Sequence, residues 1–232
     1  MNQKIRRFYS DVGITAVDSG FQITLDKHPI KSAGQQILQL PNEKMAEQLA
    51  NEWRQQKEFI DFANMPVMRF ASTVHDNIFP RPDDTRAEIL KYAHSDLLCY
   101  RVAEPDSLVE RQASLWDPVL LQFKEELNID FVTSTGIQYV EQGGESMKRF
   151  ETLITPLEDY QLGAVHLVTV MTGSAALAIA LGNSWLTIEV AWQCAHLDED
   201  FQAEHWGEDE EATLRRQRRH AEFCAAALVF DR

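Results

Sequence analysis

Hydrophobic and polar positions alternate along the first 41 residues. Apolar residues occupy every second position from 12 to 16 and again from 21 to 25, which is the spacing of half-buried β-strands. Asp18-Ser19-Gly20 lies between the two runs and is typical of a tight turn. A further apolar run at 37–40 predicts another short strand. The pattern therefore predicts a small antiparallel sheet at the N-terminal end.

After residue 41 the apolar spacing becomes helical. Met45, Leu49 and Trp53 recur at every fourth position, so they fall on one face of a helix and Trp53 is expected in the core. The segments 107–110 and 155–158 have the spacing of capping boxes and predict two further helix starts. The fold class predicted is α+β, with an N-terminal antiparallel β-rich lobe followed by a larger, mostly α-helical lobe.

The stretch Phe79-Pro80-Arg81-Pro82 and the acidic residues after it favour a linker. This linker predicts two domains: residues 1–82, a β-rich lobe with one or two helices, and residues 83–232, a helical lobe. Residues 160–188 contain no Asp, Glu, Lys or Arg, and their length would allow a membrane span. Thr172-Gly173-Ser174 is a natural break in this stretch, and its polar residues favour a buried helical hairpin over a membrane span.

Composition and charge exclude several classes of protein. The 232 residues are 44% hydrophobic and 25% charged, as in ordinary globular proteins. Acidic residues outnumber basic ones 36 to 22, a net charge of −14, which argues against general nucleic-acid binding and docking on anionic membranes. The three cysteines are far apart and form no CxxC pair, so neither a zinc site nor a disulfide framework is indicated. The N-terminus lacks the apolar stretch of a signal peptide, and a cytoplasmic protein is expected.

The C-terminal region has the least ordinary composition. Residues 198–211 contain eight carboxylates in fourteen positions, interleaved with aromatic side chains, and four arginines follow between 215 and 219. This pattern fits a solvated helix face with ion pairs such as Glu211–Arg215. It also fits a protein-recognition patch, in which aromatic residues supply contact area and charges steer association. The partner-binding candidates are Asp198, Glu199, Asp200, Phe201, Glu204, Trp206 and Glu208.

A third interpretation of the same segment is an enzyme. Asp198, Glu199 and Asp200, with a histidine such as His205, could hold a metal ion, and a metal-dependent hydrolase is the alternative function. The triplet lacks the alternating ligands and central glycine of a calcium loop, and the chain contains no HExxH, GxSxG or GxGxxG motif and no phosphate-binding GKS or GKT. We therefore expect no catalytic residues, no metal and no cofactor. At least one carboxylate of the triplet should face solvent, because the three span only about 200° of a helix.

Several stretches in order along the chain resemble the ATP-synthase assembly chaperones of the ATP12 type. The most specific are Trp206-Gly207-Glu208-Asp209-Glu210-Glu211-Ala212 near the C-terminus and Asp96-Leu97-Leu98-Cys99-Tyr100-Arg101 in the middle. Weaker matches include Glu52-Trp53, Trp116-Asp117-Pro118 and Thr172-Gly173-Ser174. Ser32-Ala33 stands where the family usually has Thr-Pro, which bears on a local turn.

The resemblance implies a chaperone without enzymatic activity. Members of the family bind the free alpha subunit of the F-type ATP synthase catalytic head and shield the surface that later meets the beta subunit. It also implies a β-rich N-terminal lobe joined to a larger helical lobe, in agreement with the apolar pattern. Without a mitochondrial presequence, the chain is expected to be a bacterial, cytoplasmic member. Its expected partner is the alpha subunit, with no nucleic acid, no membrane insertion and no small-molecule substrate.

Overall fold

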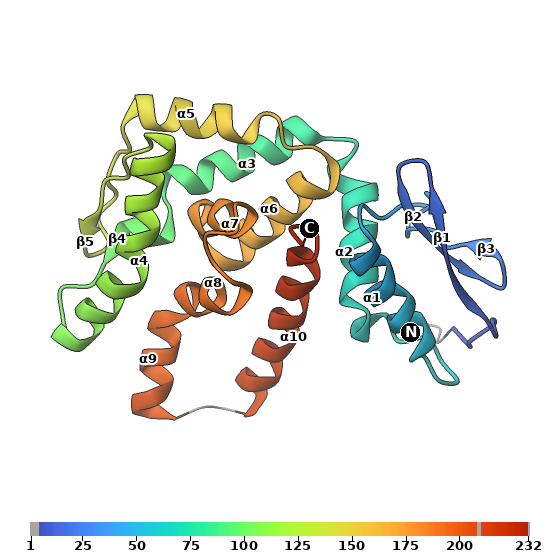
Figure 1. Cartoon of the computed structure of the whole chain (residues 1–232). Coiled ribbons are helices and arrows are strands. Elements are labelled where there is room, and N and C mark those ends of the chain that lie inside the picture. Colours follow the sequence, from blue (N-terminus) through green and yellow to red (C-terminus); the bar gives the residue numbers. More distant parts are fainter. Residues whose placement is uncertain (1–4, 208–209, 232) are drawn as a thin grey trace.

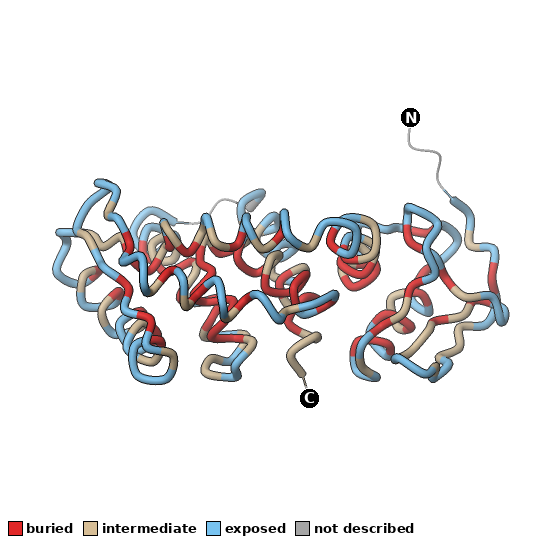
Figure 2. The backbone as a smooth tube through the Cα atoms, turned by 90° about the horizontal axis from the view of Figure 1, so that it is seen from above, coloured by how far each residue is buried: buried red, intermediate tan, exposed pale blue. Residues whose placement is uncertain are grey.

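The computed structural model of the chain describes residues 5–207 and 210–231 and shows an elongated molecule (Figure 1). A small sheet and the first helix lie at one end, and the remaining helices form the larger part. Buried positions run through the interior of both parts, and exposed positions follow the outside (Figure 2). The α+β class expected from the sequence is confirmed.

The N-terminal sheet has three antiparallel strands: β1 (Val12–Val17), β2 (Gly20–Leu25) and β3 (His28–Pro29). Ile14 pairs with Ile23 in the register, and β2 supplies the buried Ile23 and Leu25. Gly20 has φ +139°, and a Cβ there would lie 2.1 Å from the carbonyl oxygen of Leu40. Only glycine therefore fits the turn at this close approach.

Helix α1 (Glu43–Arg54) covers the sheet by contacting β1 and β2. Its start is fixed by Asn42, whose side-chain oxygen accepts a hydrogen bond from the Met45 backbone N–H at 2.8 Å. The predicted stripe is buried, and Trp53 is only 4% exposed. The expectation that Trp53 belongs to the core is confirmed.

The chain then turns through η1 (Phe62–Asn64) into α2 (Pro66–Thr73), which continues as a π-helical turn, η2 (Val74–Ile78). Pro66 begins α2, and the Glu52 carboxylate accepts hydrogen bonds from the next two backbone N–H groups, those of Val67 at 2.7 Å and Met68 at 2.9 Å. Helix α2 contacts both α1 and α10 (Glu210–Ala227). The division of the chain after residue 82 remains a proposal.

The larger part is built from helices with one short parallel strand pair. Its elements, beside α10, are α3 (Pro82–His94), η3 (Leu97–Cys99), β4 (Tyr100–Arg101), α4 (Asp106–Leu127), β5 (Ser134–Thr135), α5 (Gly144–Ile154), α6 (Asp159–Thr172), α7 (Ala175–Gly182), α8 (Ile188–Ala195) and α9 (Leu197–Trp206). Helix α6 contacts α3, α7 and α10 and is therefore the centre of this part.

The uncharged stretch forms the predicted buried hairpin. Helix α6 ends at Gly173, which has φ +72°, and Ser174 begins α7 by accepting a hydrogen bond from the Leu177 backbone N–H at 3.0 Å. Residues 175–181 are all buried. No helix in the described part of the chain is both long and apolar enough to cross a bilayer.

Neither of the two predicted capping boxes forms. Thr155 does not begin a helix but follows the end of α5, where its hydroxyl donates a hydrogen bond to the Glu151 carbonyl oxygen at 2.8 Å. Pro156 comes next and has no N–H with which to continue α5. The following helix, α6, begins only at Asp159. The other box, at 107–110, lies close to a real helix start, but α4 begins at Asp106 with Pro105 as its N-cap, and no side chain caps it.

Candidate functional site

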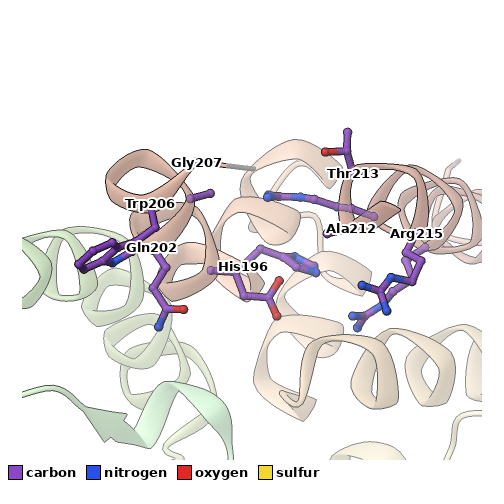
Figure 3. A pocket seen from close by; sticks show the side chains of 11 residues that line it. His196, Gln202, Trp206, Gly207, Ala212, Thr213 and Arg215 are labelled. Atoms are coloured by element: carbon purple, nitrogen blue, oxygen red, sulfur yellow. The ribbon is translucent and has the colours of Figure 1, made fainter. Parts of the chain in front are cut away.

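Helices α9 and α10 line opposite sides of a pocket of about 570 Å³ at one end of the helical part (Figure 3). Gln202 and Trp206 line the pocket from α9, and Arg215 lines it from α10. In Figure 3 the Trp206 ring lies on the outer side of α9 and points away from α10. The pocket contains members of both charge classes that the sequence pattern singled out. Of the predicted partner-binding residues that the structure describes, Glu199 and Trp206 line it.

Three of the predicted partner-binding residues fix α9 to the fold. Phe201 is buried, and Asp198 accepts a hydrogen bond from the side-chain amide of Gln112 on α4 at 2.8 Å. Gln112 is only 1% exposed, and its amide oxygen accepts a further bond from the Val102 backbone N–H at 3.0 Å. Asp200 forms an ion pair with Arg216 of α10. Asp198 and Asp200 thus connect α9 to its two neighbours.

Glu204 is exposed but not free. Its two carboxylate oxygens accept hydrogen bonds from the two terminal nitrogens of Arg111, each at 2.8 Å, and this pairing lowers the pKa of Glu204. The Arg111 guanidinium lies 5.3 Å from the centre of the Phe201 ring. Solvent screens exposed pairs of this kind, so they contribute little to stability. This pair orients Glu204 along α4.

Glu199 and Trp206 differ from their neighbours because they face solvent at the pocket. Glu199 is exposed, and its side chain forms no hydrogen bond or ion pair with the described residues. Trp206 is 87% exposed. The expectation that at least one carboxylate of the triplet is solvent-facing is therefore confirmed. Glu208 lies outside the described residues. Partner binding by these residues stays a prediction.

The arginines that face α9 were missing from the predicted site. Arg215, Arg216 and Arg219 line the same pocket, and Arg219 donates a hydrogen bond to the Met171 carbonyl oxygen of α6 at 2.8 Å. Arg219 follows Arg216 by three residues and Arg215 by four, so it shares a helix face with both. The sequence contained this signal. The sequence suggested only local pairing, whereas Asp200 on α9 pairs with Arg216 across the pocket.

The floor of the pocket is His196, which is 3% exposed and stacks on Trp192 with ring centres 3.8 Å apart. Burial lowers its pKa, which favours a neutral ring at pH 7. The charges at the pocket therefore come from the arginines and Glu199, and the site is of mixed charge instead of purely acidic.

The carboxylate triplet does not assemble as a metal site. Across residues 5–207 and 210–231, no group of three or more His, Cys, Asp or Glu side chains is placed to hold an ion. Asp198 and Asp200 are used by Gln112 and Arg216 and point to different helices. The geometry thus gives no support to the hydrolase alternative.

The three cysteines are free thiols and two are fully buried. Burial raises the pKa of Cys99 to about 12 and that of Cys194 to about 11. Both thiols are therefore protonated at neutral pH and are poor nucleophiles. The buried Trp116 donates a hydrogen bond from its indole N–H to the Cys194 carbonyl oxygen at 2.9 Å, so the surroundings of Cys194 are part of the scaffold.

Three comparisons relate the chain to known proteins. A family model described as ATP12 chaperone protein matches residues 6–124. A crystal structure of a proposed chaperone from Agrobacterium tumefaciens is 40% identical, with a TM-score of 0.89, and the match covers 97% of this chain and 85% of that one. Atp12 from Paracoccus denitrificans is 32% identical, with a TM-score of 0.87 and 97% of both chains covered. The mitochondrial protein atp12 of Schizosaccharomyces pombe is 22% identical over 219 residues, which are 89% of this chain and 75% of that protein.

Proposed function

Because the chain belongs to the ATP12 chaperone protein family, we propose that it binds the free alpha subunit of the F-type ATP synthase and shields its interface until assembly with beta. A role in assembly of the synthase comes with the family, whereas the alpha subunit as client is the specific part of the proposal. A non-enzymatic mode of action and a cytoplasmic location belong to the same proposal.

The observation in the structure that supports this function is that some charged and aromatic residues of α9 are held by the fold, whereas others on the same helix are exposed. Asp198, Asp200 and Glu204 are paired within the fold, whereas Glu199 and Trp206 are exposed beside the pocket. Tryptophan is enriched among the residues that contribute most to protein–protein binding, so an exposed Trp206 fits a contact residue. The arrangement combines an aromatic anchor with a charge that can steer association.

A chaperone must cover an aggregation-prone surface and also release it. Contacts that depend partly on exposed charge satisfy both requirements, because they increase the association rate more than the final affinity. The net charge of −14 gives long-range attraction to a basic surface of a client. The exposed residues of α9 are the part of this surface that we propose to make direct contact.

The test is capture of the client by variants of α9. Glu199→Lys and Trp206→Ala should each reduce the amount of alpha subunit held in solution on co-expression, while melting curves stay close to wild type because neither side chain is packed. Loss of an aromatic anchor commonly costs about 2 kcal/mol or more of binding, which is roughly thirtyfold in the dissociation constant. For Glu199→Lys the loss should appear mainly as slower association at low salt.

Glu126→Lys is the matched control, since Glu126 is an exposed carboxylate on another helix, α4, and carries the same charge change. This variant should hold the alpha subunit as wild type does. If Glu199→Lys and Trp206→Ala fold and protect the client normally, α9 is not the recognition surface. If wild-type protein recovers another synthase subunit and no alpha subunit from its native cell extract, the proposed client is wrong.

A further inference from the structure

Strand β1 is an edge strand of the N-terminal sheet. The sheet has the order β1-β2-β3, so within residues 5–207 and 210–231 β1 pairs with a strand on one side only. Its register with β2 runs without interruption from Val12 opposite Leu25 to Val17 opposite Gly20. The sheet lies at the end of the molecule away from α9 (Figure 1). The outer edge of β1 is therefore a surface separate from the exposed residues of α9.

Alternate residues of β1 direct their backbone groups to this edge. In an antiparallel pair, every second residue exchanges both of its hydrogen bonds with the neighbouring strand, and the residues between them point away. The Asp26 backbone N–H donates to the Asp11 carbonyl oxygen at 3.0 Å, so the odd-numbered residues of β1 bond to β2 and the even-numbered residues point outward. At Ile14 and Ala16, no described residue forms a hydrogen bond with the outward N–H or carbonyl group.

The edge lacks the features that usually protect a strand from further pairing. Protected edge strands are very short, or they carry a charged residue, a proline or a bulge. Strand β1 is six residues long, its sequence contains no charged residue and no proline, and its register is continuous. One end is covered, because Arg54 donates a hydrogen bond to the Val12 carbonyl oxygen at 3.4 Å, whereas Thr15 and Ala16 are exposed. On the other side of β2, by contrast, β3 is two residues long and contains Pro29.

The chemistry of the edge selects the kind of ligand. Outward N–H and carbonyl groups at every second residue match the backbone of an extended peptide, which can join the sheet as a further strand. Val12 and Ile14 pack against the core, so apolar side chains of an added strand would continue the same layer. Asp11 and Asp18 stand at the two ends of β1, both exposed, and their carboxylates form no hydrogen bond or ion pair with the described residues. An apolar segment with a basic residue near each end therefore complements the edge.

We infer that the β1 edge binds an extended segment of the client protein, which adds to the sheet as a fourth strand. That the segment belongs to the client rests on the proposed chaperone function, whereas the affinity of the edge for an extended peptide does not. Apolar segments with a high tendency to form strands are aggregation hazards when a subunit is not yet assembled. Pairing with β1 covers the backbone groups of such a segment, and it adds a main-chain contact to the side-chain contacts proposed for Glu199 and Trp206.

The experiment titrates wild-type protein with a short synthetic peptide of alternating valine and threonine with a lysine at each end, and follows the backbone amide signals of β1 by NMR. The control peptide has the same sequence with a methyl group on every backbone nitrogen between the lysines, so it cannot pair as a strand. We expect saturable shifts and slower hydrogen exchange at the amides of Ile14 and Ala16 with the unmethylated peptide only. The amides of Gly13 and Thr15 already bond to β2 and should keep their exchange rates.

Ala16→Pro tests the edge within the whole protein. Proline removes an outward N–H and places its ring at the edge, while the hydrogen bonds to β2 are kept. Because Ala16 is exposed, the melting curve should stay close to wild type. The variant should bind the peptide at least about tenfold more weakly and hold less alpha subunit in solution on co-expression. Ala16→Thr keeps the N–H and favours a strand, so it is the matched control and should behave as wild type does.

The inference is overturned if wild-type protein shows no saturable shift, if the methylated peptide binds equally well, or if the folded Ala16→Pro variant keeps full affinity for the peptide. If this variant does not fold, the exchange pattern of wild type with the two peptides decides. Undiminished client capture by the folded variant would show that the client does not use the edge. A wild-type dimer that Ala16→Pro abolishes would make a second copy of the chain the occupant and the inference wrong. Peptide binding without capture of the alpha subunit by wild type would contradict the proposed function and leave the strand-binding edge standing.

Discussion

Replacing Asp96 by alanine should be among the most damaging single changes to the fold. Asp96 is fully buried, and its carboxylate accepts three hydrogen bonds: from the Leu98 backbone N–H at 3.1 Å, the Ser174 hydroxyl at 2.7 Å and the Ala176 backbone N–H at 2.9 Å. One carboxylate thus joins η3 to the start of α7. Alanine would leave these donors unpaired in the interior.

The size of the effect follows from the number of donors. Each lost hydrogen bond costs about 1 kcal/mol net, and a buried donor left without a partner costs about 1–3 kcal/mol. Because neighbouring groups relax in part, we expect Asp96→Ala to lower the free energy of unfolding by about 3–5 kcal/mol. That is a large share of the roughly 5–15 kcal/mol typical of a folded domain. Asp96→Asn keeps the shape and one acceptor oxygen, so it should cost distinctly less.

Urea unfolding at pH 7.5, followed by tryptophan fluorescence, measures these differences if the denaturant slope stays constant. Glu126→Ala, a change at an exposed carboxylate of α4, is the control and should stay within about 0.5 kcal/mol of wild type. The reasoning fails if Asp96→Ala unfolds within about 1 kcal/mol of wild type, or if Asp96→Asn is the worse of the two.

Two further predictions concern α1. Trp53→Arg should cost at least about 3–5 kcal/mol in unfolding free energy and deplete folded protein, because it removes a ring that packs 5.5 Å from Tyr9 and buries an unpaired charge; a wild-type melting curve would contradict this. Burial raises the pKa of Glu52 from 4.5 to about 7. Its stabilisation relative to Glu52→Gln is therefore present below about pH 4.5 and is lost as pH rises through 7. Between pH 4.5 and 8, the free energy of unfolding of wild type, measured by urea titration, should fall by up to about 3 kcal/mol relative to that of the variant. If the two proteins show the same dependence of stability on pH, the prediction is wrong.

Local patterns predicted much of the architecture. The alternation of apolar residues predicted the strands at 12–17 and 20–25, and apolar residues at every fourth position predicted the buried face of α1. Thr172-Gly173-Ser174 predicted the break between α6 and α7. In each case the signal and the structure that it forms lie within a few residues of each other. The failed capping box at 155–158 shows the limit of such signals, because Thr155 is used by the preceding helix through the Glu151 carbonyl.

The sequence could not predict which residues of the candidate site are paired and which are exposed, because their partners are distant in sequence. Asp198 and Gln112 are 86 positions apart, and Glu204 and Arg111 are 93 apart. Nothing in the composition of the segment 198–211 distinguishes a carboxylate held by another helix from one left in solvent. The number of acidic residues predicted a charged surface. Only the structure shows that Glu199 is one of the carboxylates exposed on that surface.

Long-range contacts join several of the stretches by which the sequence resembles the ATP12 family. The Asp96 carboxylate bonds to Ser174, so the Asp96–Arg101 stretch and the Thr172–Ser174 stretch meet in one buried cluster. Glu52, from another of these stretches, holds the start of α2 through Val67 and Met68. Asp198 likewise holds α9 against α4 through Gln112.

A change of Asp198 to lysine would break this contact, so a loss of client binding could not be separated from a loss of stability. Glu199 and Trp206 are exposed at the pocket, and changes there separate client binding from stability.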